Sequence, residues 1–429
     1  MGTKTANAEQ EAPAASGTDV RRRVFISLAK ILLLFIVLHS CTTGLRFTAT
    51  LDALGHDATS FEVGCMLACV SLVPALCSIA AGRWLDRVGP RRPLMLAAAC
   101  AMTAGGGKLL LPTSFAGLWT LFAACLLVGL GFMLINTLVQ RLTGDVSTPE
   151  TRALAFTVLS IATSASGLVT PVATGYVIEH LGYAAYYAWC LCAPLAVAAI
   201  SLLPAFRPIL AGGGARQRAG AAGQNSAGGR RSALDFLKMP ALSTVIAASV
   251  IISVSWEVGN LLIPVYCTSA GLSPSDVGWI LGSFAAATFA VRLVMPMLMK
   301  HMKEWWMISG AFLISALAFA IFPFFSSKPS LMACAFLLGL GLGASFPNMM
   351  SLVYRLAPKG RVGEAIGVRL MLVNASKTGF PAVMGAVGSL IGAGAALWGL
   401  ALFAAGGFAM AVRRAHVIFE ALAALHDEK

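Results

Sequence analysis

The stretch of sequence that decides the fold is residues 24–46, VFISLAKILLLFIVLHSCTTGLR, which is apolar along most of its length. A helix needs about 20 apolar residues to cross ~30 Å of hydrocarbon, because lipid offers the backbone no hydrogen-bond partner. Similar stretches follow at 60–82, 93–111, 117–141, 153–178, 183–203, 240–266, 275–299, 304–323, 330–354, 362–390 and 393–412. The pattern predicts an all-α membrane protein with twelve transmembrane helices, because buried helices of a soluble protein do not recur in this way.

The composition also indicates a membrane protein. Of the 429 residues, 58% are hydrophobic and only 11% are charged, whereas a soluble domain has about 25% charged residues. Most of the 31 lysines and arginines lie at the chain ends or in every second loop. Cytoplasmic loops hold an excess of these residues, so we expect both termini in the cytoplasm. The net charge of +13 indicates no nucleic-acid partner, since such a protein would gather its basic residues on one face.

Two halves of the chain repeat the same spacing of residues. The first reads Gly129, Gly131, Asn136, Pro149, Arg152, Pro171, Gly175 and Gly182, and the second reads Gly341, Gly343, Asn348, Pro358, Arg361, Pro381, Gly385 and Gly392. Matches in this order, at an offset near 210 residues, indicate a duplication. We expect two pseudo-symmetric six-helix bundles with a substrate site at their interface, near the middle of the membrane.

The duplication divides the chain into five parts. The predicted halves are 24–203 and 239–412, joined by a cytoplasmic linker at 204–238 that is rich in glycine and arginine. Residues 1–23 are polar and predicted to be disordered. Residues 413–429 are predicted to be a cytoplasmic tail.

The loop after the second span carries the motif Gly82-Arg-Trp-Leu-Asp86-Arg87-Val-Gly89-Pro-Arg91-Arg92. It resembles the signature of the major facilitator superfamily in this loop, with Pro90 where a basic residue is usual. The resemblance implies a transporter whose conformational latch is formed by Gly82, Asp86, Arg87, Gly89 and Arg91. Asp86 would face the positive N-terminal end of span eleven, near Glu364. The alternative is that the arginines only set the topology and Asp86 balances their charge.

Other resemblances favour export. The loops Pro149-Glu-Thr-Arg152-Ala and Pro358-Lys-Gly-Arg361-Val-Gly-Glu364-Ala are similar to those after spans four and ten of bacterial efflux permeases. Span five carries Gly167, Pro171 and Gly175, similar to the pattern of the antiporter branch, but Thr170 replaces the glycine before the proline. Uptake therefore stays open.

Ionisable residues inside a span are costly and are candidates for function. One face of span one carries His39, Thr43 and Arg46, and span seven, its repeat partner, carries Ser253, Glu257 and Asn260 at the same spacing. We expect His39 and Glu257 to face the central cavity and to carry a transported proton. The alternative is that each makes only a hydrogen-bonded helix contact.

Cations outnumber carboxylates within the spans. Arg46, Arg292, Arg369 and Lys377 face one candidate buried carboxylate, Glu257. An anionic group on the substrate would neutralise the excess; alternatively, Arg292 and Arg369 meet water or lipid phosphate. Neutral hydrogen-bonding groups on the predicted pathway are Asn136, Asn260, Asn348 and Asn374. Near span ends, Lys30 and Lys108 are expected to extend to the lipid headgroups.

Other classes of function lack their sequence signals. The ten cysteines lie mostly inside spans and are expected to be packing residues, although Cys65, Cys69 and Cys77 allow a soft-metal site. We find no nucleophile motif, metal-ligand set or phosphate-binding loop, so we expect neither an enzyme nor a cofactor.

The sequence therefore predicts a monomeric secondary transporter in the lipid bilayer, and the resemblance to bacterial efflux permeases implies a multi-pass protein of the bacterial inner membrane. It is expected to couple to protons and to move a small polar or anionic organic compound, with export favoured. The alternatives are an uptake permease for an organic anion or a metal chelate, and a non-transporting membrane sensor on the same scaffold.

Overall fold

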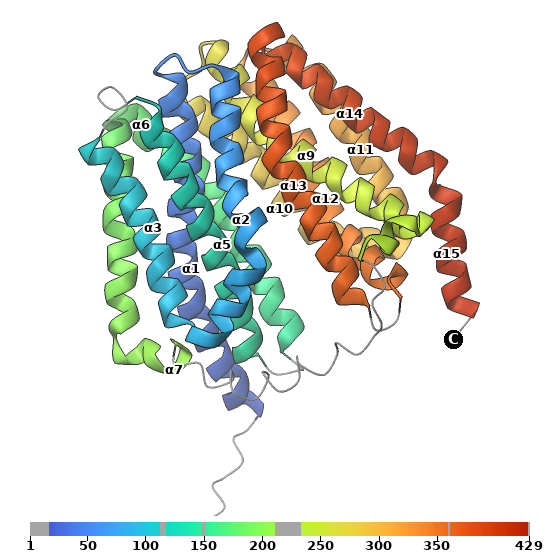
Figure 1. Cartoon of the computed structure of the whole chain (residues 1–429), viewed down its shortest axis with the longest axis horizontal. Coiled ribbons are helices and arrows are strands. Elements are labelled where there is room, and N and C mark those ends of the chain that lie inside the picture. Colours follow the sequence, from blue (N-terminus) through green and yellow to red (C-terminus); the bar gives the residue numbers. More distant parts are fainter. Residues whose placement is uncertain (1–16, 112–116, 148–150, 211–232, 359–360, 428–429) are drawn as a thin grey trace, which may run out of the picture.

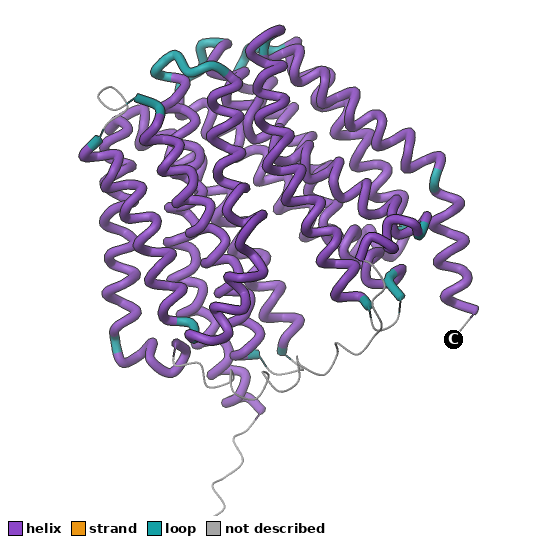
Figure 2. Tube along the Cα trace, in the orientation of Figure 1, coloured by secondary structure: helices purple, strands orange, loops and turns teal. Residues whose placement is uncertain are grey.

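The computed structural model describes residues 17–111, 117–147, 151–210, 233–358 and 361–427. At some helical positions, including Gly82 and Asp86, it describes the backbone alone. Figure 2 shows helices joined by short connections, and no strand occurs in the described ranges. The predicted all-α class is confirmed.

The first half consists of five long helices and two short ones. They are α1 (Gly17–Leu54), α2 (Ser60–Val88), α3 (Arg91–Leu110), α5 (Trp119–Val146) and α6 (Arg152–Leu202), followed by η1 (Pro204–Phe206) and α7 (Arg207–Leu210). Helix α6 contains two spans, because its backbone is non-helical at Gly182, where φ is 80°. Helix α1 begins at Gly17, so the disorder predicted for residues 17–23 is wrong; Arg21, Arg22 and Arg23 are good helix formers and extend the first span.

The second half repeats this arrangement. It consists of η2 (Ala233–Lys238), α9 (Pro240–Ser269), α10 (Pro274–His301), α11 (Glu304–Ile321), η3 (Phe322–Phe324), α12 (Lys328–Leu356), α13 (Val362–Ile391), α14 (Ala393–Arg413) and α15 (Ala415–Asp427). Gly392, where φ is 90°, separates α13 from α14 at the place that Gly182 holds in the first half. Residues 211–232 of the predicted linker lie outside the described residues, and the predicted tail forms α15.

Twelve spans follow from these helices. Within the described residues, ten helical segments are long and apolar enough to cross a membrane. One of them, Leu154–Leu202, is the two spans of α6. Helix α13 is 30 residues long but contains Arg369, Asn374 and Lys377, and it supplies the twelfth span. The prediction of two six-helix bundles with twelve spans is confirmed.

Two helices at the interface of the halves begin with the same N-terminal capping motif. The Thr59 hydroxyl accepts a hydrogen bond from the backbone N–H of Glu62, and the Glu62 carboxylate accepts one from the backbone N–H of Thr59. Ser273 and Asp276 form the same capping box before α10. Each box satisfies two N–H groups that a helix start leaves free, which fixes where α2 and α10 begin.

The halves meet along two pairs of helices, α2 with α13 and α6 with α10 (Figure 1). The ribbons of the two halves diverge toward the end where α1 begins, which we call the splayed end. We call the opposite end, with the turns at 55–59 and 270–273, the closed end. There a Cβ on Gly64 or Gly385, or on Gly175 or Gly278, would collide with a backbone carbonyl of the opposite half, so these crossings require glycine.

The structure changes which residue of α12 corresponds to Gly129 of α5 in the repeat. A Cβ on Gly129 would strike the carbonyl oxygen of Val70, and a Cβ on Gly339 would strike that of Phe284 in the equivalent helix pair. The counterpart of Gly129 is therefore Gly339, and not Gly341 as the sequence spacing indicated. Three glycines alternate with leucine from 339 to 343, so the spacing alone permits both registers.

Candidate functional site

A buried carboxylate joins the two halves at the centre of the candidate site. Glu257 of α9 accepts a hydrogen bond from Arg46 of α1, with 2.5 Å between Nη2 and Oε2. Its other oxygen, Oε1, lies 3.4 Å from Nζ of Lys377 on α13. The side chain of Glu257 is 10% exposed, while those of Arg46 and Lys377 are 25% and 26% exposed. The two cations therefore reach more solvent than the carboxylate that they share.

The charge balance of this cluster is its main chemical property. A desolvated carboxylate requires a partner, and removing one member of such a cluster leaves an uncompensated charge. Here two cations share one carboxylate, so the cluster carries a formal excess of one positive charge when Glu257 is ionised. Arginine and lysine both bind carboxylate and phosphate groups. The cluster can accept an anion.

The sequence indicated all three members but not their contacts. Glu257 was expected to face the cavity, and Arg46 and Lys377 were two of the four cations set against this one candidate carboxylate. The structure pairs Lys377 with Glu257, which neutralises part of the predicted cation excess. No signal in one sequence shows that residues so far apart along the chain meet.

The two remaining cations have hydroxyl partners. Arg369 is 1% exposed; its Nε donates to Ser249 Oγ at 2.9 Å, and its guanidinium lies 5.2 Å from the ring centroid of Phe346. Arg292 donates from Nη1 to Ser164 Oγ of the opposite half at 2.7 Å. No carboxylate in the described part of the chain pairs with either arginine. Contact with an anionic substrate group and contact with water or lipid phosphate both stay open for these arginines, and their place in a substrate pathway stays a prediction.

His39 is directed into the first half. Its Nδ1 lies 2.9 Å from Ser166 Oγ, and its ring packs beside Phe35 and Phe132. The residue is 5% exposed. This is the hydrogen-bonded helix contact that was the alternative expectation for His39. Arg46, about two turns further along α1, contacts Glu257 instead.

The predicted asparagines bind mostly to their own helices. Asn136, Asn260 and Asn348 each donate a hydrogen bond to the carbonyl of the residue four positions earlier. Asn348 is fully buried, and its Oδ1 has no hydrogen-bond partner within the described residues. Asn374 is half-buried, one turn before Lys377. Among them, Asn260 and Asn374 lie nearest in sequence to the central cluster.

The predicted latch is described only in part. Gly89 ends α2 with a φ of 76°, and Arg87 and Arg91 are exposed. The side chains of Asp86 and Glu364 are not described, and for Gly82 only the helical backbone is described. Next to the motif, Arg141 of α5 donates from Nη1 to the carbonyl of Leu85 at 2.7 Å, which ties α5 to the end of α2. The latch stays a prediction.

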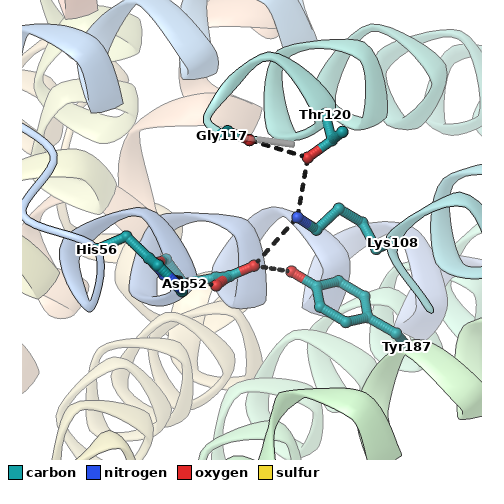
Figure 3. A network of polar contacts seen from close by, with 6 residues as sticks. All are labelled: Asp52, His56, Lys108, Gly117, Thr120 and Tyr187. Atoms are coloured by element: carbon teal, nitrogen blue, oxygen red, sulfur yellow. Dashed lines mark hydrogen bonds and ion pairs between the residues drawn. The ribbon is translucent and has the colours of Figure 1, made fainter. Parts of the chain in front are cut away.

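A second ionic cluster, not expected from the sequence, lies inside the first half (Figure 3). Asp52 of α1 accepts a hydrogen bond from the Tyr187 hydroxyl at 2.7 Å, and the same oxygen lies 3.5 Å from Nζ of Lys108. Lys108 also donates to Thr120 Oγ1 at 3.0 Å, and His56 Nδ1 lies 3.2 Å from the other oxygen of Asp52. The prediction that Lys108 extends to the headgroups is wrong: it is 2% exposed because Asp52 supplies a partner inside the bundle.

The structure offers no clear metal position. Within the described residues, no group of three or more histidine, cysteine, aspartate or glutamate side chains is placed to hold a metal ion. The ten cysteines are free.

One comparison with known proteins identifies a family, and another identifies structures with the same fold. The family model described as Major Facilitator Superfamily matches residues 31–377 and 245–420. No curated protein sequence matches the chain. Several solved structures share its fold over most of its length.

Three solved transporters illustrate this likeness. A POT family transporter in complex with a thioalcohol-conjugated peptide is 12% identical, with a TM-score of 0.71 over 92% of this chain and 96% of that one. A bacterial homologue of the human lysosomal transporter Spinster, inward-facing and occupied, is 13% identical, with a TM-score of 0.68 over 93% and 97%. A bacterial homologue of the iron transporter ferroportin, inward-facing, is 16% identical, with a TM-score of 0.66 over 93% and 99%.

Proposed function

Because this chain belongs to the major facilitator superfamily, we propose that it is a proton-coupled secondary transporter of a small organic anion. It would act as a monomer in a bacterial inner membrane and bind protons and the substrate between its two halves. A non-transporting sensor and an intramembrane enzyme are the competing functions. Neither is favoured by a specific contact in the described residues.

The observation that carries the proposal is the position of Glu257 between Arg46 and Lys377. The two cations come from different halves, so whatever anion they bind also holds the halves together. Glu257 fills this position in the present structure. A substrate carboxylate or phosphate would compete for the same donors, since both present oxygen atoms in a similar geometry.

A proton on Glu257 would make room for the substrate. The neutral carboxyl group binds cations more weakly than the carboxylate, so protonation frees Arg46 and Lys377 for the anion. The excess of positive charge on the cluster makes the binding of an anion favourable and the binding of a further cation unfavourable. Proton and anion then occupy the site together, and a singly charged anion returns the cluster to the formal charge of +1 that it has when Glu257 is ionised.

This coupling bears on the direction of transport. Joint binding of a proton and an anion leads to cotransport, and an inward proton gradient then drives uptake. The Gly-Pro pattern that favoured export has a second explanation in packing, because Pro171 and Gly175 form the crossing of α6 with α10. We therefore propose uptake of an organic anion, which was the sequence-based alternative, and antiport is the outcome that would contradict it.

The test is transport in proteoliposomes with a panel of organic anions and metal chelates, with and without an imposed pH gradient. Wild-type protein should accumulate its substrate when the substrate side is acidic. Glu257→Gln should lose gradient-driven accumulation but keep substrate exchange, since the glutamine is neutral in the same shape. Arg46→Ala should weaken binding by roughly ten- to hundredfold.

A matched control is Glu420→Gln, which removes an exposed carboxylate of α15 far in sequence from the cluster and should leave flux unchanged. Gradient-driven accumulation that survives in Glu257→Gln would remove this residue as the coupling site. Accumulation driven by the opposite gradient would show export.

A further inference from the structure

The closed end is held by two crossings that are related by the repeat. In one, Gly385 of α13 packs on the carbonyl of Ser60 at the start of α2. In the other, Gly175 of α6 packs on the carbonyl of Pro274 at the start of α10. The two glycines are 210 residues apart. Separation of the halves at this end requires both crossings to open.

In each crossing, a side chain of one half also accepts a hydrogen bond from a backbone N–H of the other half. Ser389, four residues after Gly385, accepts at Oγ from the backbone N–H of Phe61 at 2.8 Å. Glu179, four residues after Gly175, accepts at Oε2 from the backbone N–H of Ser275 at 3.0 Å. Both N–H groups lie in the first turn of a helix, where no carbonyl of the same helix can accept them. The same structural position thus holds a hydroxyl in one repeat and a carboxylate in the other.

This difference has a chemical consequence. A hydroxyl group does not change its charge between acid and neutral pH. An ionised carboxylate at a helix N-terminus gains from the helix dipole, and its hydrogen bond to an N–H is about twice as strong as a neutral one. Both gains are lost when the carboxylate takes up a proton.

The charged neighbours of Glu179 come from three helices. His180 follows it on α6 and stacks on Tyr176 at 4.1 Å. Asp276 lies in the first turn of α10, where Lys328 of α12 approaches its Oδ1 to 2.8 Å. Asp276 closes the capping box of its own half, so a proton on it breaks no contact between the halves. Glu179 is exposed and is open to protons from the solution at the closed end.

We propose that Glu179 is a proton-binding site of the closed end, whose protonation releases the start of α10 and favours opening of that end. The ionised Glu179 holds α6 and α10 together. The hydrogen bond of Ser389 between α13 and α2 does not change with pH. Acid on this side of the membrane then shifts the transporter toward the state that is open to this side. The response is separate from proton binding at Glu257 and needs no substrate.

The test measures the distance between the halves at the closed end of the purified full-length protein in lipid nanodiscs. Spin labels on Leu181→Cys of α6 and Ser326→Cys of the turn before α12, both exposed, report this distance by pulsed spectroscopy. The background carries serine at the accessible cysteines Cys65, Cys69, Cys77 and Cys192. Between about pH 7.5 and about pH 4.5, which brackets a carboxyl titration, the long-distance population should rise roughly two- to fivefold.

Four variants separate this site from its neighbours. Glu179→Gln should show the raised population at both pH values, because its amide oxygen accepts the bond without charge. Ser389→Ala should raise the population but keep the pH response. His180→Gln and the control Glu420→Gln should respond to pH as the parent does. A pH response that persists in Glu179→Gln, or that disappears in His180→Gln or Glu420→Gln, overturns the proposal.

Discussion

Asp52 and Lys108 form a buried pair whose two charges depend on each other. Their side chains are 5% and 1% exposed, and removing one partner of such a pair costs about 3–5 kcal/mol because the other charge stays buried. Asp52→Asn should therefore lower the thermal unfolding temperature of the purified protein markedly. Thermal unfolding followed by circular dichroism in detergent measures the effect.

The double variant Asp52→Asn/Lys108→Met is the control for this prediction. Methionine has a similar length and no charge, so the double variant should recover most of the stability that Asp52→Asn loses. If the double variant is less stable than the single one, the pair contributes by something other than mutual charge compensation.

At the scale of residues, the sequence showed which ionisable side chains are costly to place inside a span, but it did not show which partners they contact. Arg46 and Glu257 were recognisable because an ionisable group inside a span needs a partner. Which partner each has depends on how helices rotate and pack, and one sequence carries no direct signal for that. Lys108 shows the limit: its position near a span end predicted contact with headgroups, whereas Asp52 holds it inside the bundle.

At the scale of helices, the crossing of α2 with α13 depends on Gly385. A Cβ at this position would collide with the carbonyl oxygen of Ser60, and overpacking of this kind costs about 1–3 kcal/mol. Gly385→Ala should therefore raise the population in which the closed end is apart, as measured by spin labels across that end. Stability of the separate halves should change little, because the collision lies between them.

Gly379 on the same helix is the matched control. It is exposed, and no atom lies within 4 Å of the position that a Cβ would take. Gly379→Ala should leave the conformational population unchanged and stabilise the helix by up to about 1 kcal/mol. An equal effect of both substitutions would assign the change to helix propensity instead of packing.

Most helix positions could be predicted, and their exact ends and register could not. Apolar length fixed the spans to within a few residues, since the hydrocarbon thickness sets it. Gly182 and Gly392 mark the same bend in both halves because a positive φ favours glycine. The register of α12 was missed, since Gly339, Gly341 and Gly343 fit the pattern equally until packing against α10 selects one.

At the scale of the whole molecule, the two ends differ in charge. The described lysine and arginine side chains that are exposed gather at the splayed end: Arg22, Arg87, Arg91, Arg92, Arg207, Lys238, Lys303, Arg355, Arg413 and Arg414. The closed end carries Asp57, Glu62, Glu179 and Asp276, and Lys328 there is paired with Asp276. Since cytoplasmic ends are rich in lysine and arginine, the splayed end is expected to face the cytoplasm.

This orientation predicts which cysteines an impermeant maleimide reaches from outside the cell. Ser326→Cys lies at the closed end and Arg414→Cys at the splayed end, and both positions are exposed. In a background with serine at Cys65, Cys69, Cys77 and Cys192, Ser326→Cys should be labelled in intact cells. Arg414→Cys should be labelled only after the cells are permeabilised, because the basic end stays on the cytoplasmic side. The parent background without either cysteine should give no signal, and the reverse pattern of labelling would place the termini outside and contradict the orientation inferred from the charges.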